Sequence, residues 1–253
     1  MESIRELRTI CQKGDNEAFV YFRVLVRPIS IYITRVFLSL GISANSATLL
    51  SIISVLTGSI LLVTQEPVLR LTAGLLLYLY TILDGVDGEV ARYHVHRNQA
   101  PPGRVGQYAD AIAHLLSFNI ALFGLGMGLY LNTGMLTFVG AGFLASFMHS
   151  RVQHAAAHEV ITTLLTRKEE FAALSNRVAA SQVKQHSTFA RLREWLIWPF
   201  PMGLVLPLVL ITEWMLQTPT FFLSGAFLGV YLLFSTAMFV RSISKQMALF
   251  RSL

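Results

Sequence analysis

The sequence predicts an all-α integral membrane protein with six transmembrane helices and an N-terminal interfacial amphipathic helix. Of the 253 residues, 54% are hydrophobic and only 13% are charged, whereas a soluble domain carries roughly 25% charged residues. The mean hydropathy of +0.57 means that much of the apolar surface needs a solvent other than water. The apolar residues also gather into segments long enough to cross a bilayer. These observations exclude an ordinary soluble enzyme and a disordered chain.

Residues 1–43 are predicted to form a cytoplasmic N-terminus that ends in the interfacial helix. The first residues are polar and lack the apolar core of a secretory signal peptide. Residues 18–40 are apolar but contain three arginines, and each arginine at the centre of a span costs about 3 kcal/mol. We therefore expect a helix that lies in the membrane interface and bends near Pro28. A seventh span is the less favourable alternative.

Residues 44–242 are predicted to form a six-helix membrane domain, followed by a cytoplasmic tail of residues 243–253. Each of six apolar segments spans or nearly spans the hydrocarbon core. Gly124 and Gly128, four residues apart, are expected to allow close packing between helices. The predicted spans are Ala44–Val63, Leu69–Leu83 (continuing toward Arg92), Gly106–Leu131, Met135–Ser150 (continuing toward Leu165), Trp195–Gln217 and Phe221–Val240.

The basic residues predict the orientation of these helices. Of the 20 Lys and Arg residues, all except Arg70 fall on one side of the membrane when the N-terminus is placed in the cytoplasm. Because basic residues concentrate in cytoplasmic loops, both termini are predicted to be cytoplasmic. The net charge of +6 then reflects these loops, and no nucleic-acid partner is expected. The single cysteine, Cys11, excludes an internal disulfide. A bacterial-type inner membrane is the expected location.

Two aspartates directly follow the apolar part of the second predicted span. Carboxylates this close to the bilayer core are costly and mark functional sites. On a helix, Asp84, Asp87, Gly88 and Ala91 share one face because they are three, four and seven residues apart. That face presents two acids beside two residues with almost no side chain, so a bulky group could approach the backbone closely.

The third predicted helix begins with Gly106, Asp110 and His114, which also share one face. Because the second and third helices are joined on the cytoplasmic side, their acids are expected to converge. Three carboxylates repel one another unless a cation lies among them, and such a set suits Mg²⁺ or Mn²⁺. The pattern predicts metal-assisted phosphoryl transfer. In the alternative, the acids cap helix ends or pair with Arg92 and Arg104.

The pattern Asp84-x2-Asp87-Gly88-x2-Ala91-Arg92, followed by Gly106-x3-Asp110, resembles the signature of the CDP-alcohol phosphotransferases. These are six-helix membrane enzymes, usually homodimers, that move a phosphoalcohol group, often phosphatidyl, from a CDP-linked donor to an acceptor hydroxyl and release CMP. Residues 41–48 resemble the family's segment before the first span. Residues 146–151 resemble its arginine-containing segment on the fourth helix. The likeness covers about residues 20–240.

The resemblance implies a role for each matching residue. Asp110 and His114 would be catalytic, and the metal ligands would be Asp84, Asp87, Asp110 and His114. The donor's nucleotide and diphosphate would lie against Asn45, Thr48, Asp87, Gly88, Ala91, Arg92 and Gly106. His149 and Arg151 would face a phosphate of the donor or acceptor. The implied partners are a CDP-alcohol such as CDP-diacylglycerol, a small alcohol or lipid acceptor, membrane lipids and a second copy of the chain.

Several positions depart from the family pattern. His114 stands where the family has a fourth aspartate, its proposed general base. Imidazole, with an ordinary pKa of about 6.5, can accept a proton at neutral pH or bind metal. Thirteen residues separate Arg92 from Gly106, where the family usually has eight. Ala44 replaces a proline and His149 replaces an arginine.

Two functions follow from these observations. The leading prediction is a metal-dependent transferase of phospholipid biosynthesis. The alternative, motivated by His114, is a catalytically inactive family member that binds lipid or nucleotide or acts as a partner subunit.

Overall fold

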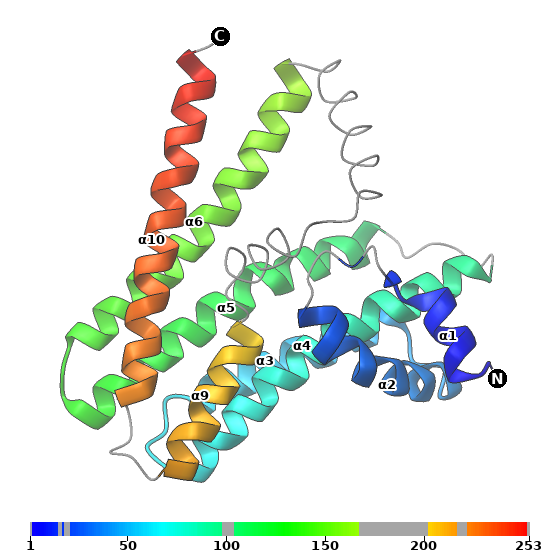
Figure 1. Cartoon of the computed structure of the whole chain (residues 1–253), viewed down its shortest axis with the longest axis horizontal. Coiled ribbons are helices and arrows are strands. Elements are labelled where there is room, and N and C mark those ends of the chain that lie inside the picture. Colours follow the sequence, from blue (N-terminus) through cyan, green and yellow to red (C-terminus); the bar gives the residue numbers. More distant parts are fainter. Residues whose placement is uncertain are drawn as a thin grey trace.

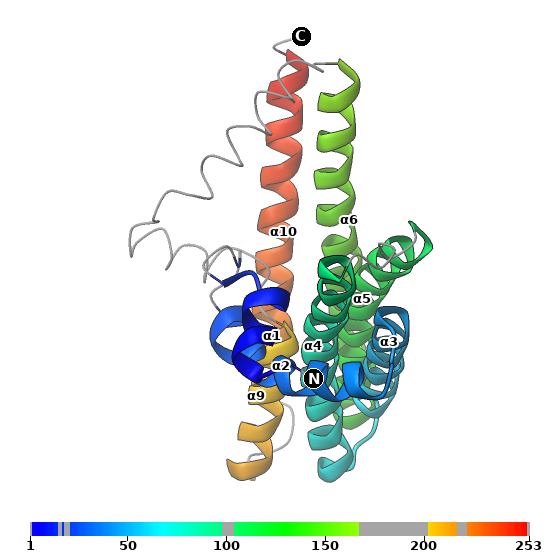
Figure 2. The same cartoon turned by 90° about the vertical axis from the view of Figure 1, so that its right-hand side faces the viewer.

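The computed structural model describes residues 2–14, 17, 21–97, 104–166, 202–216 and 222–251. These residues form eight α-helices (Figure 1), which confirms the all-α prediction. In chain order the helices are α1 (Ile4–Cys11), α2 (Arg27–Ser39), α3 (Ala44–Leu61), α4 (Pro67–His96), α5 (Arg104–Thr133), α6 (Thr137–Thr166), α9 (Met202–Leu216) and α10 (Phe222–Arg251). A π-helical segment, Phe22–Val26, leads directly into α2. Figures 1 and 2 show α6 and α10 side by side, extending beyond the other helices.

Within the described residues, three helices are long and apolar enough to cross a membrane. They are α3, α4 and the Phe222–Arg241 part of α10. Helix α9 is apolar over Gly203–Leu216 but shorter, and the predicted span Trp195–Gln217 is described only between Met202 and Leu216. Large apolar side chains lie exposed on these helices, as expected where lipid is the solvent. Examples are Leu49, Ile53, Ile60, Leu75, Leu208, Val230 and Leu233.

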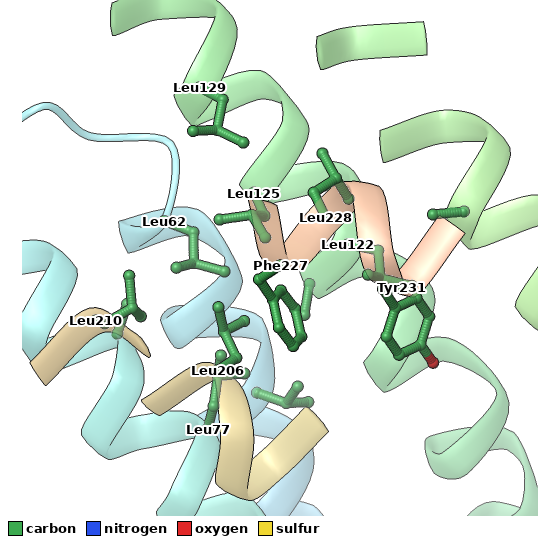
Figure 3. Close-up of a cluster of buried hydrophobic side chains, with 14 of the residues drawn as sticks. Leu62, Leu77, Leu122, Leu125, Leu129, Leu206, Leu210, Phe227, Leu228 and Tyr231 are labelled. Atoms are coloured by element: carbon green, nitrogen blue, oxygen red, sulfur yellow. The ribbon is translucent and has the colours of Figure 1, made fainter. Parts of the chain in front are cut away.

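The hydrophobic core lies where α3, α4, α5, α9 and α10 meet (Figure 3). Its buried side chains include Leu62, Leu77, Leu122, Leu125, Leu129, Leu206, Leu210, Phe227, Leu228 and Tyr231. Helix α5 approaches α3 through Gly124 and Gly128. A Cβ at Gly124 would stand 2.5 Å from the carbonyl oxygen of Ser59, and one at Gly128 would overlap the carbonyl of Leu62. The expected role of this glycine pair in close packing is confirmed.

Arg70, the one basic residue predicted outside the cytoplasmic segments, is buried. Its Nη2 donates to Ser224 Oγ at 3.1 Å and lies 3.8 Å from Glu213 Oε2. Glu213 also accepts hydrogen bonds of 2.6 Å from both the backbone N–H and the hydroxyl of Ser224. This cluster joins the start of α4 to the end of α9 and the start of α10. A buried charge is tolerable here because it is paired and hydrogen-bonded.

Candidate active site

The turn between α2 and α3 places the first turn of α3 beside α4. Gly41 has a φ of +68°, a left-handed conformation that ends helices and that residues with a Cβ rarely adopt. The backbone N–H of Ile42 then donates to the carbonyl of Phe37 at 2.8 Å. Ser43 caps α3, because its hydroxyl accepts a hydrogen bond of 3.2 Å from the backbone N–H of Ser46.

Thr48 of α3 meets Asp87 of α4, which brings two residues of the predicted donor site together. The threonine hydroxyl donates to Asp87 Oδ2 at 2.7 Å. Asp87 is 9% exposed, and a carboxylate this buried needs hydrogen-bond donors. Thr48 therefore orients the acid. Asn45, one turn earlier on α3, is exposed.

Asp84 of α4 meets His114 of α5, as the convergence of the second and third predicted helices requires. His114 Nε2 lies 3.0 Å from Asp84 Oδ1. The other ring nitrogen, Nδ1, lies 3.3 Å from the hydroxyl of Tyr80, which in turn accepts a hydrogen bond of 2.9 Å from Ser117. The imidazole is thus held at both nitrogens, an arrangement typical of an oriented base or metal ligand.

Gly106 and Asp110 lie in α5, two turns and one turn before His114. Their side-chain positions are outside the described part of the chain. Among the side chains that are described, no three His, Cys, Asp or Glu residues gather as a metal site. The donors that are placed, namely the carboxylates of Asp84 and Asp87 and the ring of His114, are nonetheless of the kinds that Mg²⁺ and Mn²⁺ accept. The donor chemistry therefore fits a divalent ion.

Arg92 folds back over Gly88 on the same strip of α4 as Asp84, since the three residues are four apart. A Cβ at Gly88 would stand 3.1 Å from Arg92 Nη1. The Nε of Arg92 donates to the backbone carbonyl of Cys11. Its Nη2 is buried and has no hydrogen-bond partner among the described residues. A buried guanidinium nitrogen in this state is suited to an anionic partner. Ala91, beside it, is half-buried.

His149 and Arg151, both on α6, have different surroundings. His149 is 4% exposed, and its Nδ1 lies 2.8 Å from the hydroxyl of Tyr231. The ring of Phe118 stands between His149 and Tyr80, with centroid separations of 5.6 and 6.0 Å. Arg151 is exposed, and its guanidinium lies 4.9 Å from the centre of the Phe147 ring. The contacts described for His149 and Arg151 do not test the expected phosphate binding, which stays a prediction for both residues.

Sequence reasoning missed Glu89, the most extensively hydrogen-bonded acid of this region. Its side chain is fully buried and accepts hydrogen bonds from Arg27 Nη1 at 2.9 Å, Ser30 Oγ at 2.6 Å, Thr34 Oγ1 at 2.6 Å and Gln12 Nε2 at 3.1 Å. Arg27 is also buried, whereas the sequence suggested a side chain in the membrane interface. An acid inside the Asp84–Arg92 stretch and an arginine in an otherwise apolar helix were the available signals.

The N-terminal residues also approach the acids of α4. Burial, with a further contribution from the nearby Asp84 carboxylate, raises the pKa of Tyr21 to about 12. The Tyr21 phenol is therefore neutral beside the acidic face. Burial likewise raises the pKa of the Cys11 thiol to about 11.

The stretches that carry these contacts, residues 84–92 and 106–114, fall inside a segment that matches a known protein-family model. The match covers residues 42–245, and the model describes CDP-alcohol phosphatidyltransferases. A comparison with curated proteins finds no match. Because the family model spans most of the chain and includes both acidic stretches, the chain belongs to the CDP-alcohol phosphatidyltransferase family, the integral membrane CDP-alcohol phosphotransferases of phospholipid synthesis.

Proposed function

We propose that the protein is a metal-dependent transferase that moves a phosphoalcohol group, phosphatidyl in the first instance, from a CDP-alcohol to an acceptor hydroxyl with release of CMP. The observation that supports this most directly is the 3.0 Å separation between Asp84 Oδ1 and His114 Nε2. It joins the acidic stretch of α4 to the start of α5, which supports placing both halves of the signature in one site.

Asp84, Asp87 and Asp110 would hold Mg²⁺ or Mn²⁺, with the imidazole of His114 beside them. The bound ion would neutralise the donor's diphosphate and stabilise the CMP leaving group. Thr48 keeps the Asp87 carboxylate oriented through its 2.7 Å hydrogen bond. Hydrogen bonds that orient a metal ligand in this way commonly influence the affinity for the metal.

Arg92, whose guanidinium lies over Gly88, would bind the donor's diphosphate with its Nη atoms. Asn45, Ala91 and Gly106 would border the nucleotide. These residues bind and orient the donor so that its reacting phosphorus faces α5.

His114 would accept the proton of the acceptor hydroxyl. The acceptor oxygen then forms a bond to the phosphorus that carries the alcohol, and the bond from that phosphorus to the bridging oxygen breaks, so CMP leaves. Tyr80 would hold the imidazole at Nδ1 during this step, and Nε2, which lies against Asp84 in this structure, would take the proton when the Asp84 carboxylate turns to the metal. His149 and Arg151 would contribute to binding a phosphate of donor or acceptor, with CDP-diacylglycerol as the first donor to test.

We also propose the arrangement in the membrane. Six helices, α3 to α6 with α9 and α10, would span the bilayer of a bacterial-type inner membrane with both termini in the cytoplasm. The π-helical segment and α2 would lie in the interface. Two copies of the chain would form a homodimer.

The test is CMP release by the purified protein from CDP-diacylglycerol and other CDP-alcohols, with a panel of acceptors and Mg²⁺ or Mn²⁺. Asp87→Asn is expected to abolish release, because the amide cannot supply the charge that holds the metal. Glu66→Gln, which changes an exposed acid at the opposite end of α4, is the matched control and should retain activity. No release by the unmodified protein across the panel would contradict the proposal.

A second candidate is an inactive family member that retains lipid or nucleotide binding, because His114 stands at the position of the family's fourth aspartate. His114→Asp and His114→Ala separate the two functions. An inactive scaffold would gain turnover with aspartate, whereas an enzyme that uses the imidazole as its base would lose most of its turnover with alanine.

A further inference from the structure

The N-terminal helices hold the acidic stretch of α4 through a buried cluster centred on Glu89. Its carboxylate receives hydrogen bonds from Arg27, Ser30, Thr34 and Gln12. Arg27 Nη1 also donates to the carbonyl of Gly85 at 3.0 Å, and its Nε donates to Glu17 at 2.8 Å. Each of these polar side chains has a hydrogen-bond partner within the cluster, which makes the cluster a rigid connection between α4 and the segment before α3.

A second set of contacts fixes the following turn of α4. The carbonyl of Cys11, the last residue of α1, accepts a hydrogen bond from Arg92 Nε. The next residue, Tyr93, donates to Glu2 Oε1 at 2.9 Å, and Arg97, about one turn further on, pairs with the same carboxylate. Helix α1 and the residue Glu2 before it therefore contact α4 at Arg92 and on its C-terminal side.

The Cys11 contact uses one edge of the Arg92 guanidinium and leaves the other facing Gly88. Arg92 Nη1 would lie 3.1 Å from a Cβ placed at Gly88, and Arg92 Nη2 is buried without a described partner. A guanidinium binds phosphate through two parallel N–H groups, so its orientation decides whether both can be used. The contact to Cys11 sets that orientation.

We propose that the N-terminal segment, residues 2–39, is a positioning element of the active site, in which the Glu89 cluster and the Cys11 carbonyl orient Arg92 toward the donor's diphosphate. Glu89 and Thr34 are positioning residues, since they act through Arg92. This inference rests on the proposed function and adds a part of the chain that lies before the family match at residues 42–245.

Thiol labelling of Cys11 can measure whether this N-terminal segment is docked on α4. Cys11 is the only cysteine, it is fully buried in a cluster that joins α1 to Ile31 of α2 and Tyr93 of α4, and its high pKa slows reaction with thiol reagents further. A maleimide can therefore label Cys11 only when α1 leaves α2 and α4. If nucleotide binding uses the oriented Arg92, bound nucleotide must in turn stabilise the docked state of α1, since such coupling is reciprocal.

The experiment measures the rate at which a maleimide labels the full-length protein, with and without CDP and Mn²⁺. CDP binding is measured separately by calorimetry on the same sample. At ten times the dissociation constant of CDP, labelling should slow by up to about tenfold. Binding of CDP without any slowing would overturn the inference and leave the proposed function standing. Absence of CDP binding with both Mn²⁺ and Mg²⁺ would overturn the proposed function and the inference with it.

Variants at Thr34 distinguish positioning from a purely structural role. Thr34→Val removes the hydroxyl that donates to Glu89 Oε2 but keeps the side-chain shape, so it should raise the basal labelling rate and weaken CDP binding severalfold. Thr34→Ser, which retains a hydroxyl, should restore both. Thr72→Val is the matched control, because the Thr72 hydroxyl bonds the carbonyl of Val68 in its own helix. Faster labelling in Thr34→Val with unchanged CDP affinity would overturn the positioning role.

Discussion

Thr48 Oγ1 and Asp87 Oδ2 lie 2.7 Å apart, and this hydrogen bond joins α3 to the acidic face of α4. The same hydroxyl lies 3.2 Å from the carbonyl of Ala44 in its own helix, and its single proton bonds the nearer acceptor, Asp87. A family signature that is read on α4 and α5 alone thus depends on a residue of α3.

Thr48→Val should weaken metal binding and leave the fold intact. The buried Asp87 carboxylate would lose a donor, and losing a contact that orients a metal ligand typically costs 10–100-fold in metal affinity or activity. CMP release measured against Mn²⁺ concentration should shift to higher concentrations by about that factor. Thr48→Ser, which keeps the hydroxyl, should behave like the unmodified protein. An unchanged metal requirement in the valine variant would contradict the role given to Thr48.

Tyr80→Phe should lower kcat by roughly tenfold, because losing a contact that orients the proton acceptor costs less than the roughly 10²–10⁴-fold that the acceptor itself contributes. The KM for the donor should change little, because the tyrosine contacts His114, the predicted proton acceptor. Steady-state kinetics give both values. Tyr32→Phe is the control, since Tyr32 is 57% exposed on α2. A change in KM alone would show that Tyr80 does not act through the imidazole.

Gly128→Ala should destabilise the bundle, whereas Gly229→Ala should not. A methyl group at Gly128 overlaps the carbonyl of Leu62, but nothing lies within 4 Å of the corresponding position at Gly229. Overpacking of this kind costs about 1–3 kcal/mol. Thermal unfolding in detergent compares the two variants directly, and equal melting temperatures would contradict the close contact between α3 and α5.

Arg70→Met should destabilise the protein by about 3–5 kcal/mol, because it leaves Glu213 as a buried charge without its cation. The double variant Arg70→Met with Glu213→Gln should recover part of that loss, since both charges are removed together. Unfolding free energies of the two single variants and the double variant give the coupling between the residues. Additive effects would show that the pair contributes nothing as a pair.

Alkaline pH should release α1 from α4. The Cys11 pKa in the folded protein, about 11, lies above its ordinary value of 9.0 because the thiolate is disfavoured by burial. The contribution of the neutral thiol to stability is therefore complete below pH 9 and is lost as the pH rises through 11. Protease cleavage of the N-terminal residues, measured against pH, should rise over this interval. Cys11→Ala has no thiol to ionise, so its cleavage should not rise with the same dependence.

The sequence was sufficient to predict the elements of the site whose geometry is local. Asp84 and Asp87 share a helix face by spacing alone, and the contact between Asp84 and His114 follows from two consecutive helices joined on one side. The buried pair of Glu89 and Arg27 was not predictable in this way, because the two residues are distant in the chain and meet only when α2 docks on α4. Only 13% of the residues in this chain are charged, so each buried ion pair between distant residues has a large effect on which side chains lie in the interior.

His149 illustrates a different difficulty. Helix α6 is apolar around most of its circumference, so its sequence does not indicate which face turns inward. The structure directs His149 to Tyr231 and leaves Arg151 exposed. The family motif predicts phosphate contacts for both residues because they are neighbours in the sequence. In the structure the two side chains have different surroundings.

The backbone contact of α3 with α5 limits how a substrate can enter. At Gly124 and Gly128 the two helices meet with no side chain between them, so neither can slide along the other without collision. Thr48 and His114 are consequently carried on one stiff unit. We therefore expect a movement that admits a lipid-sized substrate to involve the helices around α3 and α5 and not a separation of these two helices.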